Sequence, residues 1–387
     1  MTETIEFPRR RPGQFSPPDE YARLRERPGL VRSALPNGST VWLVARHEDV
    51  RAVLTDRRIS ASPLREGFPT IGANGTVPSP EAIPGWFVAY DPPEHARFRK
   101  ALVQEFTVRR IAELKGPVQR TVSARIDAML DAGRTADLVS DFALPVPSTV
   151  ICHLLGVPYH DHELFETRTR TLVTFTSTDA QRTLATNELL VYIGKLVAVK
   201  SRFPGNDLIS RALARGTLTP REIEGVALLL LIAGHETTAN NIALGALLLM
   251  QNPQWIGNAG VVEEVLRYLS VADRVALRVA IEDVEIGGQL IRAGEGIVPL
   301  GAAANHDEKE FAGAAEFCPS RSGGHHVAFG FGIHQCLGQH LVRLEMTEAF
   351  TTLFERLPGL RLDRPAEELP VKHDGVIFGL RSLPVRW

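Results

Sequence analysis

Cysteine is scarce in this chain of 387 residues, which has only three, and no two of them form a CxxC pair. A disulfide framework is therefore not expected, and a reducing, cytoplasmic environment is. The formal net charge is only -2, which argues against wholesale nucleic-acid binding. Residues 1–14 contain Glu3, Glu6 and a run of arginines, so they are typical of neither a signal peptide nor a membrane anchor.

The chain also lacks a Pro/Gly/Ser linker, a low-complexity tract and an internal repeat, so we predict that residues 1–387 form a single domain. Hydrophobic residues make up 44% of the chain and charged residues 23%, as in soluble globular proteins. Helical periodicity dominates the middle of the sequence. We predict a mainly α fold with a minor β-rich part (α+β), in which about residues 1–60, 271–303 and 369–387 form the β-rich side.

The most informative stretch is residues 329–338, where Gly330, Gly332 and Gly338 surround Cys336 just before an amphipathic segment. Glycines permit positive φ, so backbone N–H groups of this loop and of the following helix can point at one atom. A thiolate at a helix N-terminus is expected to have a depressed pKa and to be a good ligand for iron. The alternative is a core cysteine behind a Gly-rich turn.

A long buried helix is predicted to begin after Thr219, which forms a capping box with Glu222 and precedes about thirty mostly apolar residues. Polar groups interrupt its centre at Gly234, Glu236 and Thr237. Gly234 and the adjacent threonine predict a local widening of the helix. A carboxylic acid beside an alcohol can relay protons to bound dioxygen, whereas a buried polar kink with satisfied hydrogen bonds is the alternative.

Two weaker motifs lie on predicted helices. Asp91 and Glu94 predict a capping box, and His95 and Arg99 then share one face of the helix that follows. Glu264 and Arg267, three residues apart, are neighbours on another helix. Each pair alone is more typical of a solvated surface than of a binding site or a buried network.

Zinc is an alternative metal, because histidines and cysteines are dense near the C-terminal third of the chain. The conceivable ligands are Cys318, His325, His326, His334 and Cys336. No pair among them has the C-x₂₋₄-C or H-x₃₋₅-H spacing of common zinc sites, which disfavours this interpretation.

Together these motifs resemble those of the cytochrome P450 family, and the resemblance runs from about Asp19 to Trp387. Its motifs occur in family order: the acid and alcohol motif at 233–238, Glu-x-x-Arg at 264–267, and the cysteine loop at 329–338. Departures are minor, such as a short segment at 251–261, and they affect local surface geometry.

The resemblance implies a cytochrome P450 fold that holds haem b between the long central helix and the cysteine loop, with the Cys336 thiolate as iron ligand. The other implied cofactor-binding residues are His95, Arg99, Ala233, Gly234, Arg278, His326, Phe329, Gly330, His334 and Gly338. Glu236 and Thr237 would be catalytic and deliver protons. Glu264, Arg267 and Arg321 would form a buried structural network. The implied substrate pocket contains Phe87, Val88, Leu229, Ala233, Val275 and Ile377.

The activity implied by the resemblance is hydroxylation of a C–H bond with O2. The expected substrate is a sizeable hydrophobic small molecule, such as a macrolide, another polyketide or a xenobiotic. Electrons would come from a separate ferredoxin and ferredoxin reductase, with an acidic ferredoxin at the basic patch of Arg97, Lys100, Arg109 and Arg110. A monomer is expected, with no nucleic-acid or membrane partner. The alternatives are a peroxygenase that uses peroxide and a non-catalytic haem sensor.

Overall fold

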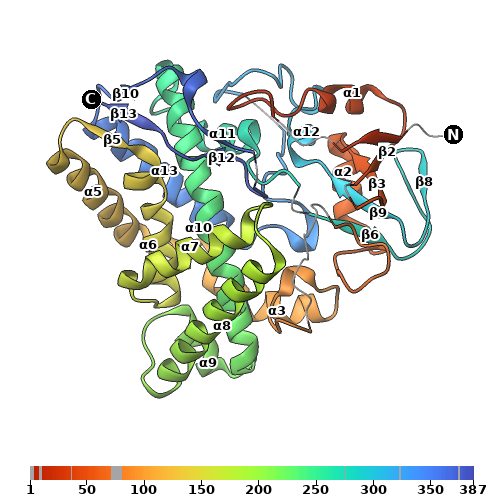
Figure 1. Cartoon of the computed structure of the whole chain (residues 1–387), viewed down its shortest axis with the longest axis horizontal. Coiled ribbons are helices and arrows are strands. Elements are labelled where there is room, and N and C mark those ends of the chain that lie inside the picture. The colour runs from red at the N-terminus through yellow and green to blue at the C-terminus, as the bar shows by residue number, and fades with distance from the viewer. Residues whose placement is uncertain are drawn as a thin grey trace.

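Helices fill one side of the molecule and the largest sheet lies at the other, as Figure 1 shows. The computed structural model describes residues 4–7, 11–35, 37–70, 81–274, 276–321, 324–373 and 375–387. The predicted mainly α fold with a minor β-rich part is confirmed. Within the described residues, none of the helices combines the length and apolarity that crossing a membrane requires.

The helices are α1 (Glu20–Glu26), α2 (His47–Thr55), α3 (Glu94–Leu102), α4 (Val108–Ala112), α5 (Lys115–Ala132), α6 (Pro145–Leu155), α7 (His162–Val173), α8 (Asp179–Arg202), α9 (Leu208–Arg215), α10 (Pro220–Gln251), α11 (Val261–Leu269), α12 (Gly301–Asn305) and α13 (Gln339–Arg356). The strands are β1 (Thr4–Glu6), β2 (Val31–Ala34), β3 (Thr40–Val44), β4 (Ile59–Ser60), β5 (Thr135–Asp137), β6 (Arg278–Ala280), β7 (Val284–Ile286), β8 (Gln289–Ile291), β9 (Gly296–Pro299), β10 (Arg361–Leu362), β11 (Val371–Lys372), β12 (Gly379–Leu380) and β13 (Pro384–Arg386).

The largest sheet has six strands in the order β1-β2-β3-β9-β6-β4, so it joins the N-terminal segment to the segment that follows α11. Strand β3 pairs in parallel with β9, and β9 pairs antiparallel with β6, which begins at Arg278. The sheet therefore fixes Arg278 at a definite place relative to the N-terminal strands.

One part of the predicted β-rich side is wrong. Strand β13 pairs with β5 and β10 in a separate three-stranded sheet, which lies beside α5 at the helical side in Figure 1. Strand pairing depends on contacts between segments far apart in the chain, and short apolar runs do not reveal their partners.

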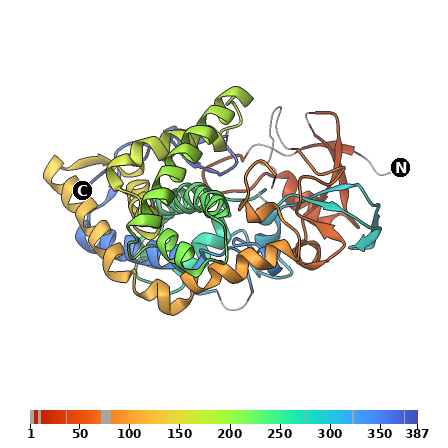
Figure 2. The same ribbon diagram turned by 90° about the horizontal axis from the view of Figure 1, so that it is seen from below.

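Helix α10 is the centre of the helical side. It begins as predicted: the Thr219 side chain accepts from the Glu222 backbone N–H, and the Glu222 side chain accepts from Thr219. Its 32 residues give a length of about 48 Å at 1.5 Å per residue. It packs against α6, α8 and α13, and Figure 2 shows it in green, nearly end-on, with other helices around it. This surrounding explains why its sequence is apolar on almost every side.

The capping box predicted for α3 is wrong. The helix begins at Glu94, but the Asp91 carboxylate accepts hydrogen bonds from the Ser60 hydroxyl and the Ala61 backbone N–H, at 2.5 and 2.9 Å. Asp91 thus ties the start of α3 to the end of β4, a tertiary contact that the local pattern could not reveal. The predicted helices between residues 164 and 190 are α7 and α8, whereas residues 71–80 of the predicted loop lie outside the described residues.

Candidate active site

The cysteine loop has the backbone conformation that its glycines predict. Gly330 and Gly332 have φ of 69° and 72°, in the left-handed region. The Cys336 backbone N–H donates to the Phe329 carbonyl at 2.8 Å, which closes the loop just before Gly338 and α13. A Cβ added to Gly332 would lie 2.7 Å from the Leu54 carbonyl oxygen, so the loop packs directly on the end of α2. The side chain of Cys336 is held in a fixed place by this packing.

The prediction of a low pKa for Cys336 is wrong when only the protein's own groups act on the thiol. Burial raises the pKa of its thiol, and the Gly338 N–H, the Arg99 and Arg343 charges and the Gln339 N–H offset only part of this effect. The helix N-terminus therefore does not by itself hold the sulfur as a thiolate. A metal cation would supply the missing positive charge, because metal binding requires and stabilises the deprotonated thiol.

Four basic side chains from α3, β6 and the cysteine loop gather in one region: His95, Arg99, Arg278 and His334. The rings of His95 and His334 are 4.0 Å apart between centroids. Burial, followed by the charges of Arg99 and Arg278, lowers the pKa of His95 to about 4, and Asp91 opposes the effect. Burial and then the other three members lower the pKa of His334 as well.

Arg278 is a buried member of this basic cluster. Its exposed fraction is 7%, and burial lowers its pKa to about 10, with Asp91 acting in the opposite direction. Within the described chain its guanidinium donates to the carbonyl of its own neighbour, Leu277, at 2.8 Å. A buried charge normally has a charged partner. The cluster of His95, Arg99, Arg278 and His334 thus has the donors for two carboxylates, which fits the propionates of haem.

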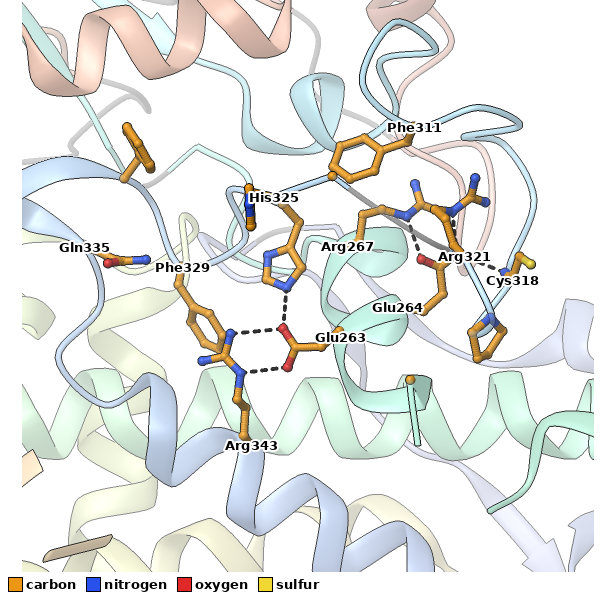
Figure 3. Close-up of a pocket in the computed structure, with 15 residues that line it drawn as sticks. Glu263, Glu264, Arg267, Phe311, Cys318, Arg321, His325, Phe329, Gln335 and Arg343 are labelled. Atoms are coloured by element: carbon orange, nitrogen blue, oxygen red, sulfur yellow. Dashed lines mark hydrogen bonds and ion pairs between the residues drawn. The ribbon is translucent and has the colours of Figure 1, made fainter. Parts of the chain in front are cut away.

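His326 does not belong to this basic cluster, contrary to the prediction. Its Nδ1 accepts from the Ala328 backbone N–H at 3.3 Å, and its Nε2 lies 3.1 Å from a Glu263 carboxylate oxygen. Sequence patterns cannot distinguish the role of His326 from that of His334, because the partner of each is set by the fold. Figure 3 shows Glu263 facing Arg343 of α13, and the Arg343 Nε lies 2.6 Å from a carboxylate oxygen of Glu263.

Glu264, Arg267 and Arg321 are brought together as the resemblance implies. Two guanidinium nitrogens of Arg267 donate to the two Glu264 carboxylate oxygens at 2.7 and 2.8 Å, and Arg321 Nε lies 3.5 Å from Glu264 (Figure 3). Arg267 also donates to the Asn305 and Ala314 carbonyls at 2.7 and 2.9 Å. A cavity of about 400 Å³ lies between this network and Phe329 and Gln335 of the cysteine loop. The network therefore links α11 to the segment that leads into the loop.

Ala233 is exposed at the centre of α10, although most residues of this helix are buried. A Cβ added to Gly234 would lie 3.0 Å from Cδ1 of Ile151, so this glycine lets α6 approach closely. The Thr237 hydroxyl donates to the Ala233 carbonyl at 2.9 Å. Helix α10 remains continuous here, so the predicted widening does not interrupt it. The open surface at Ala233 leaves room for a ligand beside the helix.

Glu236 is buried in α10, and its partner is a residue that the sequence patterns missed. The Lys372 ammonium group donates to Glu236 Oε1 at 2.7 Å. Burial alone would raise the pKa of Glu236, but Lys372, His235 and Asn240 together lower it below its ordinary value. A buried glutamate does predict a cation nearby, yet nothing local in the sequence indicates that a lysine 136 residues away supplies it.

The predicted substrate residues lie in different surroundings. Phe87 is buried 6.3 Å from the ring of His95, whereas Val88 is 44% exposed. Leu229 of α10 and Ile377, between β11 and β12, are both buried. Val275 lies outside the described residues. The contacts therefore place Phe87 beside the basic cluster.

The surface patch predicted to receive an acidic partner is partly neutralised. Arg97 forms an ion pair with Glu222, and Arg110 forms one with Glu113. Elsewhere, no group of three or more His, Cys, Asp or Glu side chains within the described ranges is arranged to hold a metal ion, so the zinc interpretation gains no support.

The chain was compared with known proteins. The cytochrome P450 family model matches residues 259–377. Cytochrome P450-SU2 of Streptomyces griseolus is 45% identical over 98% of this chain and 96% of that protein. Vitamin D3 dihydroxylase of the same species is 43% identical over 100% of this chain and 98% of that protein. The crystal structure of mycinamicin VIII C21 methyl hydroxylase from Micromonospora griseorubida, bound to mycinamicin VIII, has a TM-score of 0.91 at 36% identity and covers 99% of this chain and 100% of that one.

Proposed function

This chain belongs to the cytochrome P450 family and is a monooxygenase, and we propose that it hydroxylates a sizeable hydrophobic small molecule with O2 and electrons from a separate ferredoxin. The observation that carries the haem assignment is the basic cluster of His95, Arg99, Arg278 and His334 near the cysteine loop. Burial and the charges of Arg99 and Arg278 lower the pKa values of His95 and His334, so the two rings are neutral N–H donors beside two cations, and such a group of donors calls for anions. Haem supplies two carboxylates as well as an iron ion for Cys336.

In this proposal the Cys336 thiolate would bind the iron of haem b, and the basic cluster would hold the propionates. Ala233 and Gly234 of α10 would line the opposite face, and Phe329, Gly330 and Gly338 would shape the loop around the sulfur. When bound, haem with a thiolate ligand supplies the capacity to activate dioxygen, because the sulfur donates electron density. The two faces would come from α10 and from the segment preceding α13, and α10 packs against α13 itself.

Glu236 and Thr237 are proposed to move protons. The lowered pKa of Glu236 means that it is ionised at neutral pH, so it must accept a proton before it can release one. The Thr237 hydroxyl already donates to the Ala233 carbonyl, which leaves its oxygen free to accept a further hydrogen bond. Glu236 would then take up protons from the solvent side and pass them to Thr237, which would donate them at the open surface beside Ala233.

The substrate class is inferred from the relatives and from the apolar character of Phe87, Leu229 and Ile377. One relative is named for vitamin D3 and another for mycinamicin VIII. We propose a macrolide, another polyketide or a xenobiotic as the substrate. We also propose that the protein is a cytoplasmic monomer and that a ferredoxin reductase supplies electrons to the ferredoxin.

The test combines purified protein with NADH, a surrogate ferredoxin and its reductase, using mycinamicin VIII and vitamin D3 as probes. The expected product gains one oxygen atom, and isotope-labelled dioxygen supplies it. Product formed with hydrogen peroxide and not with NADH would favour the peroxygenase alternative. The protein could instead bind haem but consume no more NADH, with either probe, than ferredoxin and reductase consume without it. That result would contradict the proposal and favour a haem sensor.

Changing Thr237 to alanine is expected to uncouple reductant consumption from product formation. Without the hydroxyl, the ordered donor beside Ala233 is lost, and more of the consumed NADH yields hydrogen peroxide. We expect the product formed per NADH to fall by about 100-fold, the lower end of the range of effects of proton-transfer groups. The measurement is the ratio of peroxide to product.

Thr238→Ala is the matched control, because Thr238 is fully buried and its hydroxyl donates to the Gly234 carbonyl at 3.3 Å. Its coupling ratio should remain close to that of the unaltered protein. Equal uncoupling in both variants would mean that the effect comes from the helix backbone and would contradict the role given to Thr237.

A further inference from the structure

The short hairpin formed by β11 and β12 sits unusually close to the centre of α10. Lys372 of β11 pairs with Gly379 of β12. A Cβ added to Gly379 would lie 1.7 Å from the side-chain oxygen of Asn240, so any other residue there would displace the Asn240 side chain or the hairpin. The absence of a side chain at position 379 is therefore what lets the hairpin reach α10 at the turn that carries Glu236.

This close approach places Lys372 on two acceptors of α10. Its Nζ donates to Glu236 Oε1 at 2.7 Å and to Asn240 Oδ1 at 3.3 Å. Asn240 in turn donates through its amide to the Glu236 carbonyl and carboxylate, at 2.7 and 3.3 Å. The three side chains form a closed arrangement in which Glu236 Oε1 receives two donors. Glu236 is thereby fixed in position.

The charge environment of Glu236 depends mainly on Lys372. The side chain of Lys372 is 20% exposed and that of Glu236 is 9% exposed, so the lysine connects the buried carboxylate with the solvent side. The other titratable group that acts on Glu236 is His235, whose Nδ1 lies 2.7 Å from the Leu231 carbonyl and whose Nε2 lies 3.0 Å from the Thr169 hydroxyl of α7. His235 is thus engaged elsewhere, and the direct counter-ion is Lys372.

We propose that Lys372 is a positioning residue for proton delivery, which holds the carboxylate of Glu236 ionised and fixed against Asn240 while itself touching neither substrate nor haem. This inference rests on the proposed monooxygenase function. The Glu236 carboxylate takes a proton from water on the solvent side and becomes a neutral acid. It then releases that proton toward Thr237 and is a carboxylate again. Lys372 keeps its own proton throughout.

Loss of Lys372 has a defined consequence. Burial then dominates at Glu236, and a buried carboxyl without a counter-ion favours its neutral form. We expect Lys372→Met to raise the pH at which Glu236 is half protonated by about one to three pH units, which is the size of effect that an adjacent opposite charge has. The carboxyl would then become protonated at higher pH than in the unaltered protein.

Infrared spectroscopy of the haem-loaded protein measures this directly, as a pH titration of the protonated-carboxyl C=O band. Glu345 is fully buried and burial raises its pKa well above the ordinary value, so it contributes a band of its own. The band of Glu236 is therefore identified by its loss in Lys372→Met/Glu236→Gln. Lys372→Arg is the conservative variant and should restore the titration of the unaltered protein.

The proposal requires a band in Lys372→Met that titrates at higher pH than in the unaltered protein and that Glu236→Gln removes. Identical titrations in Lys372→Met and the unaltered protein would overturn it, as would survival of the shifted band in Lys372→Met/Glu236→Gln. If Lys372→Met fails to fold, Lys372→Gln gives the same comparison with a polar side chain of similar length. The infrared result needs no turnover, so a protein without hydroxylase activity could still pass or fail it independently.

Discussion

Replacing Glu264 by alanine is expected to lower the free energy of unfolding by about 3–5 kcal/mol and to prevent haem uptake, because it leaves the buried charge of Arg267 without its partner. Arg267 is 2% exposed, and two of its nitrogens donate to the Glu264 carboxylate. The same carboxylate accepts from the Cys318 backbone N–H at 2.9 Å. Its loss therefore loosens both α11 and the segment that leads to the cysteine loop.

Glu263→Ala is the matched control, since the neighbouring glutamate also pairs with an arginine but its side chain is 49% exposed. An ion pair that is this exposed contributes about 0–1 kcal/mol, because water screens it. Urea unfolding and the ratio of bound haem to protein measure both variants. Equal haem content and equal unfolding midpoints in Glu264→Ala and Glu263→Ala would contradict the structural role given to the buried network.

Replacing Cys336 by histidine is expected to abolish hydroxylation while leaving haem binding possible. Imidazole can ligate iron, and the basic cluster of His95, Arg99, Arg278 and His334 is unchanged. A neutral imidazole, however, donates less electron density than a thiolate. Weaker donation favours oxygen binding over cleavage of the O–O bond. Product formation with NADH, ferredoxin and reductase should fall below detection.

Cys318→His is the control for this substitution, because Cys318 is also partly exposed but its sulfur lies 3.4 Å from the Ser320 hydroxyl, outside the cysteine loop. Its absorption spectrum and product yield should match those of the unaltered protein. Retained hydroxylation in Cys336→His, or a loss in Cys318→His of the same size, would contradict the assignment of Cys336 as the iron ligand.

Features that depend on neighbours in the chain were predictable from the sequence. Thr219 and Glu222 cap α10 as expected, because a capping box needs only four consecutive residues. Gly330 and Gly332 adopt positive φ for a similarly local reason. The family resemblance then gave the fold, since the order of its motifs holds along the whole chain.

Features that depend on distant segments were not predictable. Asp91 binds Ser60 instead of capping α3, and His326 pairs with Glu263 instead of joining the basic cluster. Lys372 reaches Glu236 only because Gly379 lets a C-terminal hairpin approach α10. The prediction of a low pKa for Cys336 is wrong for a different reason, because burial outweighs the effect of the local N–H groups. In each case the tertiary environment decides the partner or the charge.

The absorption spectrum of the reduced, carbon-monoxide-bound protein tests the central claim most directly. Thiolate ligation by Cys336 predicts a Soret maximum at a markedly longer wavelength than in Cys336→His under the same conditions. The same maximum in both proteins, or no Soret band in the unaltered protein after haem loading, would contradict the account.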